Sequence, residues 1–225
     1  MKKLAIISLF LMTFTASAQT TITKELESFY QLKVYSGIDL ELVKADTSKI
    51  VVTGEKADKV KIKIEGYTLK VLLKFPETIA DGKVKATLYY NEDLEVIDAN
   101  EGAIITGKDI EQEQIEIKAQ EGAFINLVVN IKHLKVKSSS GAVIKLTGTT
   151  KNQTVEANLG GMYHGYKLEV AQTNIVQAGS GSKVEVQAGE TLDAKVSFGG
   201  TIFYKGTPEV LRDKKVIGGV IEHRS

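Results

Sequence analysis

The sequence predicts an all-β protein that folds as a right-handed parallel β-helix, a solenoid with coils of about 20 residues. Three observations support this fold class. Apolar and polar residues alternate with period two over much of the chain, glycines recur at nearly fixed intervals in the second half, and runs of apolar residues at helical spacing are absent after residue 18. The handedness follows from the general preference of parallel crossovers.

The first 18 residues have the pattern of an export signal. Two lysines and an apolar run over residues 4–14 precede the small residues Ala-Ser-Ala at 16–18, which predicts cleavage before Gln19. The apolar run is too short to span a bilayer. We therefore expect the mature chain, residues 19–225, to be exported to the periplasm, the cell surface or the medium, with no transmembrane segment.

The composition argues against several classes of function. With 29 Lys and Arg against 28 Asp and Glu, the total charge gives no electrostatic case for nucleic acid or for an anionic membrane surface. Cysteine is absent, which excludes thiol chemistry and cysteine–zinc sites. An exported chain without disulfides must be held together by its core and its backbone hydrogen bonds, which a continuous β-ladder provides.

Residues 19–90 are expected to form less regular coils or a cap. Four segments there alternate apolar and polar residues like half-buried strands: 32–45, 48–54, 59–66 and 69–75. A long turn is expected over residues 76–83. Lys61 and Lys63 fit a solvent-facing strand whose charges protect an exposed sheet edge.

Residues 91–225 are expected to form the regular repeats. One glycine per unit can be chosen at intervals of 19 or 20 residues, with Gly160, Gly179 and Gly199 as alternative choices: Gly102, Gly122, Gly141, Gly161, Gly181 and Gly200. Glycine suits the corner of a coil because it adopts positive φ at little steric cost.

The residues on both sides of these glycines also repeat. The segments 115–119 and 134–138 align without a gap, and so do 123–127 and 142–146. Stacking of such units predicts one set of inward-facing residues: Ile115, Ile117, Ala119, Ala123, Ile125 and Leu127 against Leu134, Val136, Ser138, Ala142, Ile144 and Leu146.

Two other architectures fit the sequence less well. A β-sandwich favours Asn-Gly or Asp-Gly hairpin turns, but the chain has a single Asp-Gly, at 81–82, and no Asn-Gly. A propeller blade needs a repeat of about 40 residues, twice the period seen here.

Three stretches resemble a known family of exported Bacteroidota-type proteins, the auto-transporter adhesins with a head GIN domain. Residues 29–55 resemble the family's opening, with Gly37-Ile38-Asp39 in place of its Gly-Ile-Asn. Residues 84–107 resemble the strand that leads into the repeats, and residues 199–224 resemble its ending. The resemblance implies a right-handed parallel β-helix in an exported protein, and it carries over no catalytic residues.

A catalytic reading requires carboxylates that converge on one face, as in β-helices that cleave polysaccharides. Asp98, Glu101 and Glu121 are the best candidates, because the two glutamates each precede a corner glycine and are expected to stack in adjacent coils. The following units carry no acid there, so a solvated turn is the favoured explanation of the pair. The histidines and serines show no metal or nucleophile spacing, and no cofactor is expected.

The stretch "GGMYHGYKLEV" (160–170) breaks the repeat with aromatic residues. Tyr163, His164 and Tyr166, with Tyr204 further along, form a candidate ligand-binding set, since aromatic rings on a solvent face stack on sugars or anchor protein partners. The alternative is that some of these rings fill a wider part of the coil interior.

The sequence therefore favours an exported, non-catalytic β-solenoid that presents a rigid surface to a glycan or a protein, as an adhesin or an envelope-binding protein. Two alternatives remain: an envelope scaffold that self-associates through its end coils as a homo-oligomer, and a polysaccharide-active enzyme.

Overall fold

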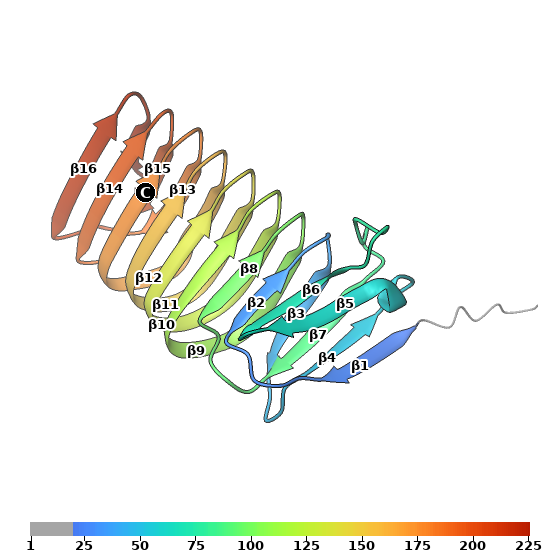
Figure 1. Ribbon diagram of the computed structural model, residues 1–225. Helices are drawn as coiled ribbons and strands as arrows, with labels where there is room; N and C mark the ends of the chain where they lie inside the picture. Colours follow the sequence, from blue (N-terminus) through green and yellow to red (C-terminus); the bar gives the residue numbers. More distant parts are fainter. Residues whose placement is uncertain (1–19) are drawn as a thin grey trace, which may run out of the picture.

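Seventeen strands joined in one hydrogen-bonded sheet make up the computed structural model, which describes residues 20–225 (Figure 1). The strands stack as successive coils of about 19 residues, and no α-helix occurs in the described part of the chain. The predicted all-β solenoid is thus confirmed, while the expected export signal lies outside the described residues. The strands are β1 (Thr21–Glu25), β2 (Gln31–Val34), β3 (Asp39–Lys44), β4 (Lys49–Thr53), β5 (Val60–Glu65), β6 (Thr68–Leu73), β7 (Lys85–Tyr90), β8 (Val96–Ala99), β9 (Ile104–Ala119), β10 (Phe124–Ser138), β11 (Val143–Ala157), β12 (Met162–Ala178), β13 (Lys183–Gln187), β14 (Thr191–Ser197), β15 (Thr201–Lys205), β16 (Val210–Val216) and β17 (Val220–His223).

The long strands β9 to β12 bend in the middle, so each passes continuously from one face of the solenoid to the other (Figure 1). They pair in parallel and in register: Ile125 lies between Ile105 and Ile144. From β13 onward each coil is divided into two strands, one per face. The result is a two-faced stack with a sharp corner on one side and a rounded bend on the other.

Each sharp corner is a two-residue turn with positive φ at both central residues. Ser140 and Gly141 have φ of 51° and 72°, and the Ala142 N–H donates to the Ser139 carbonyl at 3.0 Å, as in a type I′ turn. The Gly141 N–H points along the stack and donates to the Leu159 carbonyl of the next corner at 3.1 Å. The repeated phrase of the sequence is therefore the corner of the coil.

Two predicted corner glycines are wrong by one residue. The corners contain Gly160 and Gly199, with φ of 73° and 79°, where the sequence analysis chose Gly161 and Gly200. The chosen glycines serve another purpose: a Cβ on either would lie 2.3 Å from a backbone carbonyl oxygen of the preceding coil. Glycine is required there for close backbone approach.

The core fills the narrow space between the two faces of the stack. All twelve residues expected to face inward, from Ile115 to Leu146, are buried. Ser138, the one polar member, donates its hydroxyl to the Ala142 carbonyl at 2.9 Å, which satisfies it inside the core.

The N-terminal part is less regular, as expected. Strands β1, β4 and β7 pair antiparallel beside the first coils, and β5 and β6 form a hairpin. Strand β5 pairs only with β6 and lies at an edge, where Lys61 and Lys63 project as predicted.

The last described coil carries charges at positions that are apolar in the coil before it. The register places Asp213 of β16 beside the buried Ala194 of β14, and Lys215 beside the buried Val196. Inward-pointing charges on an edge strand disfavour the addition of another molecule's strand.

We therefore expect the chain not to stack through this end, and expect the double substitution Asp213→Ala, Lys215→Val to make it do so. The variant continues the apolar columns and should show a mass that rises with concentration in light scattering, whereas the native chain should not. Native chains that already assemble end to end, with unchanged behaviour in the variant, would contradict this role of the charges.

Candidate ligand-binding surface

Strand β12 departs from the regular repeat by two bulges. It is 17 residues long against 15 in β11, and its register with β11 shifts twice. At the first shift Leu146 faces two residues, Gly165 and Tyr166, because the flanking pairs are Lys145 with His164 and Thr147 with Lys167. A bulge of this kind re-aims a side chain relative to its neighbours, and here it holds Tyr166 on the outer surface.

Tyr163 lies in the interior, so its prediction as a ligand-binding residue is wrong. It pairs with Ile144 and Val184, is fully buried, and its hydroxyl accepts a hydrogen bond from the buried Gln153 amide. Burial raises the pKa of the Tyr163 hydroxyl above its usual value. Gly165 makes room for the ring, since a Cβ there would lie 2.6 Å from it.

On the outer face, His164 and its neighbours form a charged cluster. The Glu185 carboxylate of β13 accepts from His164 Nδ1 at 2.6 Å and from Lys183 Nζ at 2.6 Å. Burial acts to raise the pKa of Glu185, but the hydrogen bonds from Lys183 and His164 outweigh it, and the pKa is lowered. The carboxylate therefore holds His164 and Lys183 together across two coils.

Aromatic rings and cations extend this cluster toward the C-terminal coils. Arg224 lies 4.3 Å from the centre of the Phe203 ring, and Lys183 lies 5.5 Å from it. Lys205 lies 5.3 Å from the centre of the Tyr166 ring. These are cation–π distances, which orient both rings and cations at the surface.

Tyr204 points the other way. Its register partner is the buried Val186, and its ring packs against the core. The centres of the Tyr204 and His223 rings lie 5.2 Å apart in an edge-to-face arrangement. The adjacent Phe203 faces outward instead, so Tyr204 is not part of the outer cluster, contrary to expectation.

Tyr166 stands between two surface hollows. One, of about 300 Å³, is lined by Lys145, Thr147, His164 and Glu185 among others, and the second, of about 540 Å³, by Glu169 and Gln187. Tyr166 and Lys167 line both hollows. We call this region the Tyr166 surface; it consists of Lys145, Thr147, His164, Tyr166, Lys167, Glu169, Glu185 and Gln187.

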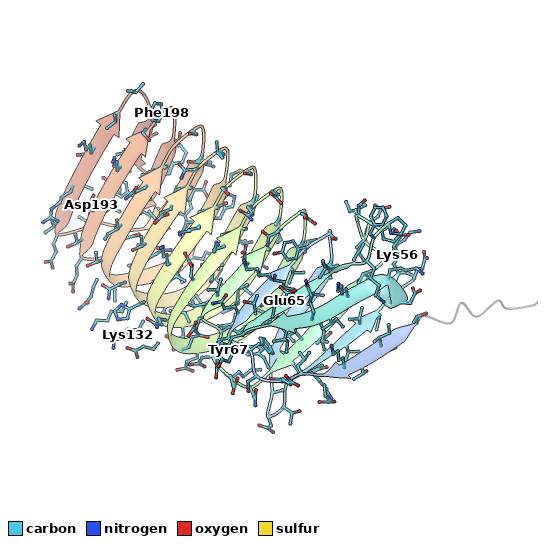
Figure 2. The ribbon with its side chains drawn as sticks, viewed as in Figure 1. Lys56, Glu65, Tyr67, Lys132, Asp193 and Phe198 are labelled. Carbon is cyan, nitrogen blue, oxygen red and sulfur yellow. The ribbon has the colours of Figure 1, made fainter. Side chains whose placement is uncertain are left out.

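A third hollow, of about 750 Å³, follows the rounded bend of the coils, on the edge of the solenoid opposite the sharp corners, where Lys132 lies (Figure 2). Its wall includes a polar ladder in which Thr149 donates to Asn130 at 2.9 Å and Asn130 to Glu111 at 3.3 Å. No aromatic side chain lines it. It therefore lacks a platform for stacking.

The acidic candidates do not converge on a hollow. Glu101 and Glu121 occupy equivalent positions at exposed corners of adjacent coils, and Glu101 accepts a hydrogen bond from the Ser36 hydroxyl at 3.3 Å. Asp98 belongs to an outward column but is covered by its neighbours. Its carboxylate accepts a hydrogen bond from the Asn100 side-chain amide at 3.2 Å and lies 3.5 Å from Lys33 Nζ. Within residues 20–225, no cluster of three or more His, Asp or Glu side chains could hold a metal ion.

The fold defines the class of protein, a β-solenoid of stacked coils with parallel strands. The chain belongs to the family described as "Putative auto-transporter adhesin, head GIN domain", whose family model matches residues 28–208. The resemblance found in the sequence is thereby confirmed. Among curated proteins, none matches the chain.

Solved structures of similar chains share the fold. A putative adhesin from Bacteroides fragilis superimposes with a TM-score of 0.79 at 18% identity, and one from Parabacteroides merdae with 0.67 at 16%. A protein from Parabacteroides distasonis titled "Putative lipid binding protein" gives 0.69 at 16%. Each comparison covers 93% of this chain and 98% of the other. At these identities the likeness concerns the fold.

The burial of Tyr163 predicts a clear difference in stability between two tyrosine variants. Tyr163→Ala removes a buried ring and should lower the free energy of unfolding by about 3–5 kcal/mol. Tyr166→Ala, at a half-buried surface position, should lower it by about 1 kcal/mol or less. Urea unfolding followed by circular dichroism measures both.

The fit between Tyr163 and Gly165 supplies a second test of the same packing. Gly165→Ala should destabilise the native chain by about 1–3 kcal/mol, and far less in a Tyr163→Val background, because the ring that its Cβ meets is gone. Equal losses in the two backgrounds would contradict the proposed packing.

The lowered pKa of Glu185 predicts a pH dependence of stability. A carboxylate whose folded pKa is depressed stabilises the fold above its ordinary pKa of 4.5, and the contribution is lost as the pH falls through the lower folded value. The gap in unfolding free energy between the native chain and Glu185→Gln should therefore be full near neutral pH and shrink below about pH 4.5. A gap that stays constant with pH would show that the ionised carboxylate is not the cause.

Proposed function

We propose that this chain is an exported, non-catalytic adhesin or envelope-binding protein that binds a glycan through the Tyr166 surface. The observation that carries the proposal is the bulge in β12, which raises one tyrosine between two hollows lined by hydrogen-bonding groups. An aromatic ring flanked by donors and acceptors suits a sugar, since the ring stacks on the C–H face and the polar groups bind the hydroxyls.

The residues around Tyr166 supply both kinds of polar group. Lys145 and Lys167 offer donors, while Glu169, Glu185 and Gln187 offer acceptors. Lys205 lies over the Tyr166 ring and limits its motion. A surface whose rings and charges are already held in place loses little conformational entropy on binding.

The alternatives have weaker support from the geometry. An enzyme that uses Glu101 and Glu121 would need both carboxylates to face a bound sugar, and they stand instead on the tips of exposed turns. A scaffold that assembles through its end coils is opposed by Asp213 and Lys215 on the last described coil. Within the described residues no helix is long and apolar enough to cross a membrane.

We expect the chain from Gln19 onward, labelled and applied to an array of bacterial and host glycans, to bind saturably in a manner competed by unlabelled protein. Tyr166→Ala should weaken the interaction about fivefold or more, because stacking of a sugar on an aromatic ring contributes on the order of 1 kcal/mol or more. The matched control is Tyr67→Ala, which removes an exposed tyrosine at the other end of the solenoid (Figure 2).

The two tyrosine variants decide the outcome. Loss of binding in Tyr166→Ala with retention in Tyr67→Ala, at unchanged melting temperatures, supports the assigned surface. Equal binding by the two variants would place the site elsewhere, and an array without a saturable ligand would contradict the glycan proposal.

A further inference from the structure

The sharp corners form a continuous ridge along one edge of the solenoid, and its composition changes toward the C-terminal end. At each corner the first left-handed residue projects outward; in chain order these residues are Ser36, Glu101, Glu121, Ser140, Leu159, Ser180, Phe198 and Ile217. The last coils replace polar side chains by Leu159, Phe198 and Ile217, which are 63%, 62% and 71% exposed. Figure 2 shows Phe198 at the tip of its turn.

These three residues are unfavourable for folding in two respects. Their φ values of 51°, 50° and 51° lie in the left-handed region, which bulky and β-branched residues avoid and which glycine or asparagine adopts readily. Their side chains also leave apolar surface in water. Backbone strain combined with exposed apolar surface points to a contact that the folded chain makes with something else.

The shape of the ridge restricts what that contact can be. The apolar tips stand on the outer edge of stacked turns, and the hollows around Tyr166 and along the rounded bend are lined by other residues. A convex apolar edge cannot enclose a small ligand. Such an edge suits a partner into which the apolar side chains can insert.

Unpaired lysines flank the same tips. Lys195 and Lys214 occupy adjacent outward positions, each three residues before an apolar tip. The ion pairs at this end of the described chain involve Lys183, His164 and Arg224, so these two exposed lysines remain without an acidic partner within residues 20–225. The near-neutral total charge conceals this local excess.

Asp193 lies two residues before Lys195 on the same face, but its register partner is Arg212, so these two opposite charges offset one another and leave the lysines as the excess. The acidic part of the ridge lies too far away to cancel the lysines. Glu121 and Phe198 are four coils apart, or about 19 Å at the spacing of neighbouring strands. That distance exceeds the Debye length of about 8 Å at physiological ionic strength. Glu156 precedes Leu159 by three residues, which places Leu159 at the margin of the basic region.

We propose that Phe198 and Ile217, with Leu159 at the margin and Lys195 and Lys214 beside them, dock the C-terminal end of the solenoid on an anionic phospholipid bilayer. The apolar tips enter the boundary between headgroups and acyl chains, and the lysines lie against lipid phosphates. This pairing of apolar side chains with flanking basic residues is how interfacial proteins bind membranes reversibly.

Co-flotation tests the proposal with vesicles of phosphatidylethanolamine and phosphatidylglycerol, compared with vesicles of phosphatidylcholine alone. The native chain should float with the anionic vesicles and less with the neutral ones. The variant Phe198→Asn, Ile217→Asn should lose binding by at least about tenfold. Its melting temperature should not fall, because asparagine tolerates positive φ.

Two further variants separate apolar from electrostatic contributions. Replacing Lys195 and Lys214 by Gln should weaken binding about fivefold for each lysine and remove the preference for anionic vesicles. The matched control Ser140→Asn, Ser180→Asn changes the same turn position without removing an apolar tip and should float like the native chain.

A native chain that stays at the bottom of the gradient with anionic vesicles would overturn the proposal, as would an asparagine variant that floats as well as the native chain. Tyr166→Ala, which tests the glycan proposal, should leave flotation unchanged. The two proposals can therefore fail independently.

Discussion

The pair of left-handed residues at each sharp corner is the constraint on which the rest of the structure depends. It reverses the chain in two residues, and it turns a glycine N–H along the stack toward the next corner, as Gly160 does in donating to the Ser180 carbonyl at 3.1 Å. Because each corner from Gly37 to Gly181 is anchored in this way to the one after it, coils begin at the same height and their strands pair in parallel. A one-residue slip would move every core side chain to the surface.

This fixed register separates the core from the surface. Inward columns stay largely apolar, as in Ile105, Ile125 and Ile144, whereas outward columns change freely from coil to coil. A coil that needs a different surface shape must gain residues without shifting its inward column. The bulge at Gly165 and Tyr166 does this, because it adds length to β12 while Tyr163 keeps its place in the isoleucine column.

The fold was predictable because its two periods, two residues along a strand and about twenty along the chain, are written directly in the order of residues. The site was less predictable, and one cause is the choice between neighbouring corner glycines. Taking Gly161 rather than Gly160 as the corner shifts the register by one, so Tyr163 falls on the outward column of Val143 instead of the inward column of Ile144. Taking Gly200 rather than Gly199 as the corner likewise assigns Tyr204 to an outward column.

A local signal could have resolved that ambiguity. Gly165 stands two residues after Tyr163, on the same face of the strand, where the preceding coils carry Leu146 and Leu127. A large ring followed by a missing side chain on one face indicates that the ring occupies both volumes, which places Tyr163 inside. The bulges lengthen their coil to 21 residues from Gly160 to Gly181, against 19 from Gly141 to Gly160, and this excess becomes visible once Gly160 is taken as the corner.

The corner ridge and the Tyr166 surface are compatible because the strand geometry separates them. Tyr166 follows its corner by about five extended residues, or about 17 Å at the rise of a β-strand. If the apolar tips of the last corners lie in the headgroup region of a bilayer, the Tyr166 surface stands beyond it on a face that runs away from the membrane. A rigid stack without hinges would hold that surface at a constant height, so a ligand could reach Tyr166 without competing with lipid. The same ladder that determines the register thus sets the distance between the two surfaces.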